Sequence, residues 1–186
     1  MKTAEITVGG KKVRMVDPGV RAVLRAQEDC LMPNGQLSLS RYVEYIGQRW
    51  CEPPLTLDDF ANEDEVVEFL RTWVEFRRPA TVGSIRAEPP TVPVGQKATI
   101  WLAPDRKVEV VNPGLRWILQ TQEACTMPNG QMSWLRYVEA ILRDCTVGQP
   151  KLDAVFVHED EVVEFVRLFR LLRTGTSTVS AGAEGS

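Results

Sequence analysis

Cysteine, histidine and clustered carboxylates are the residues of this sequence whose types could support metal binding or nucleophilic chemistry. The chain has four cysteines, Cys30, Cys51, Cys125 and Cys145, and one histidine, His158. Zinc ligands come in closely spaced pairs such as Cys-x-x-Cys, and the sequence contains no such pair. We therefore expect neither a metal nor another cofactor, and we interpret the cysteines as small buried hydrophobic residues that stay reduced.

Acidic residues cluster at Glu63-Asp64-Glu65 and again at Glu159-Asp160-Glu161. Such clusters can serve acid–base catalysis or bind divalent cations. Each cluster also precedes an apolar helical pattern, and negative side chains are favoured in the first turn of a helix by its dipole. We interpret both clusters as helix starts and His158, which precedes the second, as a capping or surface residue. The sequence lacks the common hydrolase, nucleotide-binding and metalloprotease motifs, so we predict no enzymatic activity and no catalytic residues.

Most of the sequence consists of two similar copies of one segment. Residues 13–46 and 108–141 are identical at 20 of 34 positions, and the segment Glu63–Phe69 recurs unchanged as Glu159–Phe165. This repetition predicts a tandem duplication with a first domain at 1–78, a Pro-rich linker at 79–97, a second domain at 98–173 and a flexible tail at 174–186.

Local signals predict an α+β fold, mostly α, in which each copy is a β-hairpin followed by three helices. Alternating apolar residues around Gly9-Gly10 predict the first hairpin. Asp17-Pro18 and Asn112-Pro113 fit an N-cap followed by proline at the first helical position. Ser38 and Ser133 are expected to cap the second helix of each copy.

The phrase Met-Pro-Asn-Gly-Gln occurs once in each copy, between the first and second predicted helices. Proline ends a helix, while asparagine and glycine tolerate left-handed backbone, so the phrase predicts a helix–turn–helix hinge. The alternative, in which Asn34 and Asn129 belong to a recognition loop, stays open because turns often carry contacts.

Tryptophans differ between the two copies more than core positions should. Ala22 matches Trp117, and Leu39 matches Trp134. Together with Trp73, these two tryptophans are candidates for a protein-binding surface or an interface between the copies. The alternative, in which each tryptophan covers a different edge of its own domain, is equally open.

Charge and hydropathy limit the classes of partner that this chain is expected to bind. The formal net charge is −3, with basic and acidic residues intermingled, so nucleic acid is not an expected partner. Neither a signal-peptide stretch nor an apolar run of membrane-spanning length is evident, so we expect an unanchored cytosolic protein. Domains of this size are marginal alone, so we expect the halves to pack on each other or on a partner, and a homo-oligomer remains open.

These motifs together resemble a known family. The hairpin ITVGGKKVRMV, the repeated DPGVRAVL and NPGLRWIL, the Asn-Gly turn before RYVE, and PPLTLDDF before an acidic helix resemble small tail assembly chaperones of long-tailed bacteriophages. The resemblance spans roughly residues 3–77 and 98–173. It implies a helical, non-enzymatic protein of the host cytoplasm that binds the tape measure protein and recruits tail tube subunits.

Two other functions stay open on the sequence alone. One is a structural virion component, such as a tail or head-completion subunit. The other is an inhibitor or regulatory module that grips another protein with its two copies.

Overall fold

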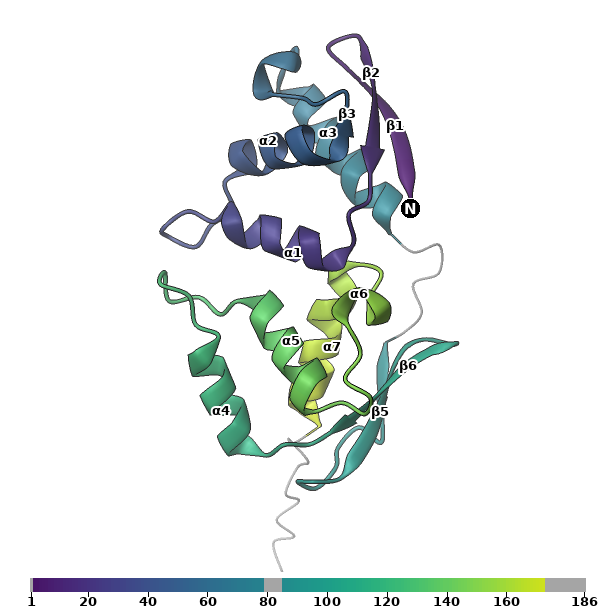
Figure 1. The fold of residues 1–186 in the computed structure, drawn as a ribbon, viewed down its shortest axis with the longest axis vertical. Coiled ribbons are helices and arrows are strands. Elements are labelled where there is room, and N and C mark those ends of the chain that lie inside the picture. The colour runs from purple at the N-terminus through teal and green to yellow at the C-terminus, as the bar shows by residue number, and fades with distance from the viewer. Residues whose placement is uncertain (1, 79–84, 173–186) are drawn as a thin grey trace, which may run out of the picture.

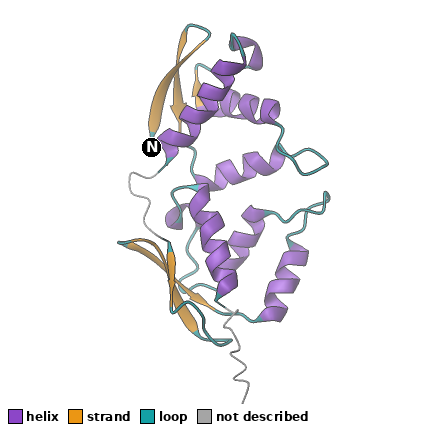
Figure 2. Ribbon diagram, turned by 180° about the vertical axis from the view of Figure 1, so that it is seen from behind, coloured by secondary structure: helices purple, strands orange, loops and turns teal. Residues whose placement is uncertain are grey.

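The computed structural model describes residues 2–78 and 85–172, and these residues form an α+β fold in which helices predominate. Two three-stranded antiparallel sheets lie on one side of the molecule and the longer helices on the other (Figures 1 and 2). The predicted tail at 174–186 lies outside the described residues.

The first repeat is a hairpin followed by three main helices. Its elements are β1 (Thr3–Val8), β2 (Lys11–Val16), α1 (Val20–Asp29), α2 (Leu39–Trp50), β3 (Cys51–Glu52), the short 3-10 helix η1 (Leu57–Asp59) and α3 (Glu63–Arg77).

The second repeat has the same order of main elements. It consists of β4 (Arg86–Glu88), β5 (Lys97–Ala103), β6 (Arg106–Val111), α4 (Leu115–Ala124), α5 (Trp134–Asp144), the four-residue α6 (Leu152–Val155) and α7 (Glu159–Leu171). Helix α6 takes the place of η1, and α4, α5 and α7 correspond to α1, α2 and α3. The predicted fold class, with a hairpin before three helices in each copy, is confirmed.

Each hairpin gains a third strand that the sequence did not predict, and the two third strands lie at opposite edges. In the first sheet β3 pairs with β2, so β1 is an edge strand; in the second sheet β4 pairs with β5. At the position of β3 the second repeat keeps only a single bridge, between Val110 and Thr146. The third strands are two or three residues long, too short to leave an alternating pattern.

The predicted linker at 79–97 is corrected in its described part. Residues 79–84 lie outside the described residues, but Arg86–Glu88 form β4 in the second sheet. The Val92 amide then donates to the Leu172 carbonyl at 2.9 Å, and the buried Asn112 side chain donates to the Val92 carbonyl at 2.7 Å. Backbone groups at the edge of β5 need partners, and this Pro-rich stretch supplies them.

The first helix of each repeat begins later than predicted. Helices α1 and α4 start at Val20 and Leu115, each preceded by a glycine with φ of 90° or 82°, a conformation that other residues rarely adopt. Asp17 is therefore not the N-cap. Its carboxylate accepts the Gly19 amide at 3.1 Å, and the Asn112 side chain accepts the Gly114 amide in the same way.

The Pro-Asn-Gly segments form the predicted turns between helices. The side chain of Asn34 accepts the Gln36 amide at 3.0 Å, and that of Asn129 accepts the Gln131 amide at 3.1 Å. Both asparagines thus build their own turns by Asx-type bonds. The two loops lie beside each other on the side of the molecule away from the sheets (Figures 1 and 2).

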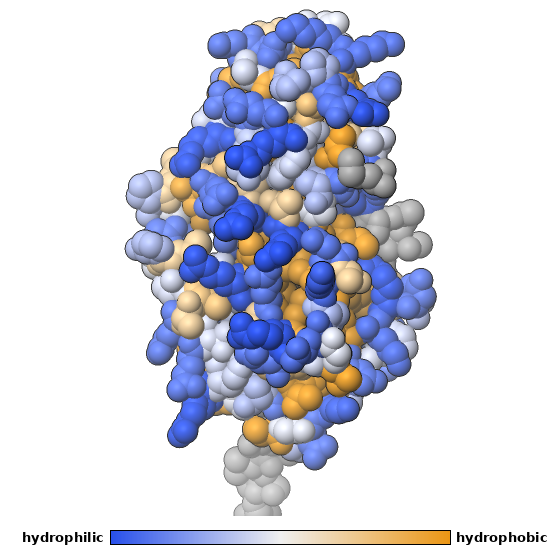
Figure 3. All heavy atoms as spheres, viewed as in Figure 1, coloured by the Kyte–Doolittle hydropathy of each residue, from blue (hydrophilic) through white to orange (hydrophobic). Residues whose placement is uncertain are grey.

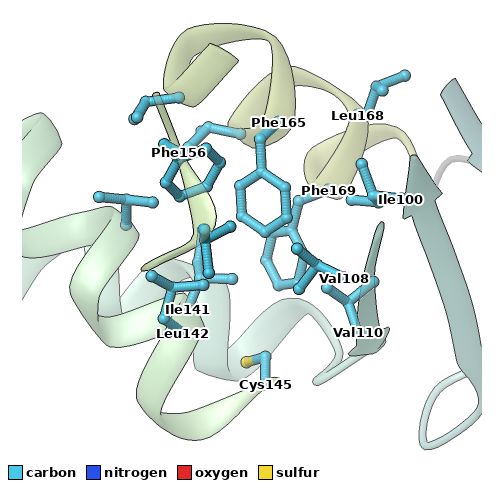
Figure 4. Close-up of a cluster of buried hydrophobic side chains, with 14 of the residues drawn as sticks. Ile100, Val108, Val110, Ile141, Leu142, Cys145, Phe156, Phe165, Leu168 and Phe169 are labelled. Carbon is cyan, nitrogen blue, oxygen red and sulfur yellow. The ribbon is translucent and has the colours of Figure 1, made fainter. Parts of the chain in front are cut away.

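Two hydrophobic clusters form the core, one for each repeat. In the second cluster Phe156, Phe165 and Phe169 meet side chains from α5 and from strands β5 and β6 (Figure 4). This cluster also takes in Val20 and Leu24, which belong to α1 of the first repeat. Helix α1 therefore packs against the core of the other repeat, and it lies between the two halves in Figure 1.

A buried ion-pair network closes the junction between the repeats. The Arg77 side chain is fully buried and donates to both carboxylate oxygens of Glu159, at 3.0 and 2.8 Å, and to Asp17 at 3.1 Å. Burial acts to lower the pKa of Arg77, but the hydrogen bonds and charges of Glu159 and Asp17 outweigh it and raise the pKa. The end of α3 is thereby tied to the start of α7.

Removing the Arg77 side chain is expected to destabilise the protein strongly. Arg77→Ala leaves Glu159 and Asp17 close together without their cation, which typically costs about 3–5 kcal/mol of unfolding free energy. Urea denaturation followed by circular dichroism measures the change. Arg71→Ala on the same helix is the control, because Arg71 makes an exposed pair with Glu68, and its denaturation midpoint should stay close to that of the unmodified chain. Equal midpoints for the two variants would contradict a structural role for the buried network.

Candidate functional site

The four cysteines are buried as single thiols, as predicted. Burial raises the pKa of all four, and it raises those of Cys51 and Cys145 to about 12. The thiolate is the reactive form of cysteine. These side chains therefore serve as small hydrophobic residues of the two cores.

The acidic clusters open α3 and α7, as predicted, and their third residues also anchor the hairpins. The Glu65 carboxylate accepts the Gly9 amide at 3.1 Å and the Ala61 amide at 2.9 Å. At the equivalent position, Glu161 accepts the Val157 amide at 2.9 Å and pairs with Arg106. In both repeats these carboxylates therefore stabilise the fold by binding backbone amides and residues of the hairpin.

His158 is the N-cap of α7, which confirms its interpretation as a capping residue. Its Nδ1 accepts the Asp160 amide at 3.2 Å, and its side chain is buried. Within residues 2–78 and 85–172, no group of three His, Cys, Asp or Glu side chains is arranged to hold a metal ion. The same described segments include no helix that is both long and apolar enough to cross a lipid bilayer.

Two of the three tryptophans proposed as binding residues are packing residues. Trp73 is 0% exposed and stacks on Trp50, with ring centroids 5.3 Å apart, so it is not a surface residue. Trp117 is half-buried and packs edge-on against Phe169, with ring centroids 6.2 Å apart. The small and large side chains change places between the repeats. Ala22 of the first repeat corresponds to the larger Trp117 of the second, and Trp73 of the first corresponds to the smaller Phe169 of the second. Paired changes of this kind are compatible with a core, which is why the mismatch misled the sequence-based prediction.

The third tryptophan lies in a groove between the repeats. Trp134, at the start of α5, is 36% exposed and lines a hollow of about 470 Å³ together with residues of both Pro-Asn-Gly loops. Asn34 and Asn129 are not among its lining residues, although Gly35 and Gln131 of the same loops are. The complete lining is Leu24, Gln27, Glu28, Leu31, Gly35, Leu37, Met127, Gln131, Met132 and Trp134.

Polar contacts across the junction hold the two walls of the groove together. The Glu28 carboxylate of α1 accepts the Ser133 hydroxyl at 2.9 Å and the Leu135 amide at 3.0 Å, at the start of α5. The Gln131 side chain donates to the Gly35 carbonyl at 3.1 Å. The Gln131 side chain occupies the space beside Gly35, where a Cβ atom would lie 2.2 Å from its amide nitrogen. The two loops are therefore in direct contact through this glutamine.

The composition of the groove suits binding rather than bond-making. Leucine, methionine and tryptophan side chains form most of the lining, with glutamine and glutamate between them. Methionine is flexible and polarizable and adapts to varied apolar partners. On the face of the molecule seen in Figure 3, hydrophobic residues reach the surface between strongly hydrophilic side chains. A lining of this composition can accept apolar side chains of another polypeptide.

Sequence reasoning found the loops and Trp134 but missed the apolar lining residues. Leu24 and Leu31 lie on a helical stripe that predicts a core face, and Met127 and Met132 flank a turn. The identical placement of the two loops in the repeats was the available signal. Only the docking of the repeats brings the loops together.

No family model, curated protein or solved structure matches this chain.

The raised cysteine pKa values predict slow thiol labelling of the folded protein. At pH 8, a shift of the pKa from the usual 9.0 to about 12 at Cys51 and Cys145 lowers the thiolate fraction about 1,000-fold. A chromogenic disulfide reagent should therefore label the chain slowly in buffer and quickly in urea. Rapid labelling of the native chain at these two residues would contradict their burial.

The raised pKa values also predict how the free energy of unfolding depends on pH. The stability contributed by the neutral thiols is complete below pH 9.0 and is lost as the pH rises toward about 12.

Proposed function

We propose that this chain is a non-enzymatic assembly chaperone or adaptor of the kind that long-tailed bacteriophages use to build tails. In this proposal it acts in the host cytoplasm and binds tape measure and tail tube proteins. The observation that carries the proposal is the apolar groove between the repeats, which is lined by two methionines, three leucines and Trp134 and framed by the two Pro-Asn-Gly loops.

The groove supports a chaperone because such a protein must hold apolar segments and later release them. Flexible methionines let one surface accept several sequences, as promiscuous binding surfaces do. The glutamine and glutamate side chains in the lining limit the apolar contact area and thus the affinity. A moderate affinity permits the client to leave when assembly proceeds.

The duplication supports the same function through geometry. Both repeats contribute walls to one groove, and the covalent link keeps those walls at high effective concentration. The buried thiols and the structural roles of the acidic clusters are consistent with a protein that works by contact. The sequence resemblance to tail assembly chaperones supplies the class of client.

The direct test is co-expression of this chain with the tape measure and tail tube proteins of a long-tailed bacteriophage, chosen from the genome that encodes it, followed by affinity pulldown. We expect retention of at least one of the two proteins, and retention of neither would contradict the proposal. Mass spectrometry of purified particles should find the chain absent, because a chaperone leaves before the virion is complete. Its presence in fixed copy number would indicate a structural subunit instead.

Variants of the groove test whether it is the binding site. The double variant Met127→Ala/Trp134→Ala removes two lining side chains, and client retention should fall about tenfold or more, as expected for anchor residues of an interface. Val163→Ala is the control, because Val163 is an exposed aliphatic residue on α7 that does not line the groove. Equal retention by both variants would place the binding site elsewhere.

A further inference from the structure

The two repeats contact each other through different surfaces. The first repeat contributes one face of α1, here called the α1 face and defined by Val20, Arg21, Leu24 and Glu28. The second repeat contributes the first half of α5 and the start of α6, here called the acceptor face and defined by Ser133, Leu135, Glu139 and Asp153. The junction is therefore heterologous, with a head on one repeat and a tail on the other.

Specific contacts define this junction. Val20 and Leu24 are buried in the second core. The Arg21 backbone amide donates to Asp153 at 2.9 Å, and its guanidinium pairs with Glu139 at 2.8 Å. Glu28 accepts the Ser133 hydroxyl and the Leu135 amide, and so completes the capping of α5 by a residue of the other repeat.

Because the chain is duplicated, a second copy of the α1 face exists on α4. The equivalent residues, here called the α4 face, are Leu115, Arg116, Leu119 and Glu123. Three of the four are identical to their counterparts, and the fourth exchanges valine for leucine. The α4 face is open: Leu115 is 58% exposed and Leu119 is 50% exposed, whereas Val20 and Leu24 are buried.

A second copy of the acceptor face exists on the first repeat. Its residues are Ser38, Ser40, Glu44 and Asp58, and both serines and Asp58 are at least partly exposed. Ser38 occupies the N-cap of α2 but makes no capping bond with its side chain, whereas its counterpart Ser133 accepts the Arg136 amide and donates to Glu28. The start of α2 therefore resembles the start of α5 but has no counterpart of Glu28 bound to it.

We propose that the α4 face of one chain docks on the first repeat of a second copy of this chain, in the way that α1 docks on the second repeat within one chain. The occupant is a second copy because the molecule itself shows the homologous face seated on the homologous site. In this contact Glu123 accepts the Ser38 hydroxyl and the Ser40 amide, while Leu115 and Leu119 leave water. A heterologous contact of this kind joins chains head to tail into a ring or a filament.

The contact between chains is weaker than the one within the chain. Ser40 stands where the acceptor face of the second repeat has Leu135, so less apolar area is buried. The contact also lacks the effective concentration that the covalent link provides. Association is therefore concentration-dependent. The proposal rests on the duplicated junction and is independent of the identity of any client.

Two blocking variants separate the two faces. Leu119→Glu places a charge on the α4 face while keeping a good helix-forming residue. Ser38→Asp keeps an effective N-cap on α2 but sets a carboxylate against the incoming Glu123. The control is Val147→Glu, because Val147 is also 50% exposed and gains the same charge outside both faces. Circular dichroism and thermal unfolding verify that each variant is folded.

Sedimentation velocity of the full chain, from about 1 μM to about 1 mM, measures association across the usual range of weak contacts. We expect the unmodified chain and Val147→Glu to associate as concentration rises, and Leu119→Glu and Ser38→Asp each to lose about tenfold or more in association constant. An equimolar mixture of the two blocked chains should form a dimer that does not grow, because each supplies the face that the other lacks.

Three results would overturn the proposal. The first is an unmodified chain that stays monomeric at the highest concentration. The second is association that Leu119→Glu leaves unchanged. The third is a mixture of blocked chains that forms no dimer, which would indicate a symmetric contact or none.

Discussion

The structure depends on the burial of one helix face of the first repeat in the core of the second. Val20 and Leu24 of α1 join the second hydrophobic cluster, and Arg77 closes the same junction by binding Glu159 and Asp17. Small domains bury a small fraction of their surface and are only marginally stable alone. Because α1 packs against the core of the second repeat, the two repeats fold as one larger unit.

This junction explains how the repeats differ. The second repeat presents Leu135 and the capped start of α5 to α1. At the equivalent places the first repeat has Ser40 and Ser38, and the Ser38 side chain makes no capping bond to α2. Likewise, the first repeat buries Val20 where the second exposes Leu115. The difference in sequence therefore lies on the side that receives the helix, where Leu135 replaces Ser40, whereas three of the four α1-face residues recur unchanged on α4.

The candidate binding groove is a by-product of the same docking. Each Pro-Asn-Gly turn is a short hinge held by its own asparagine, and residues of both turns line the same hollow. When α1 seats against α5, the two hinges come together, and methionine and leucine side chains that would cover separate edges line a common groove. A functional surface thus arises from the contact between two structural elements.

The sequence alone determined the features that depend on neighbours along the chain. It predicted the duplication, the Gly9-Gly10 hairpin, the turns at Asn34 and Asn129, the cap at Ser133, and the helix starts at the acidic clusters, because each is fixed by local backbone preferences and short-range hydrogen bonds. Ser38 stands at the predicted N-cap of α2 but makes no capping bond with its side chain. Only the tertiary structure decided the features that join distant residues. The third strands, the burial of Trp73, the exposure of Trp134 and the partner of Arg77 depend on which surfaces meet. A helical stripe of apolar residues predicts that a face is buried, but it does not say whether its own domain or the neighbouring one covers that face.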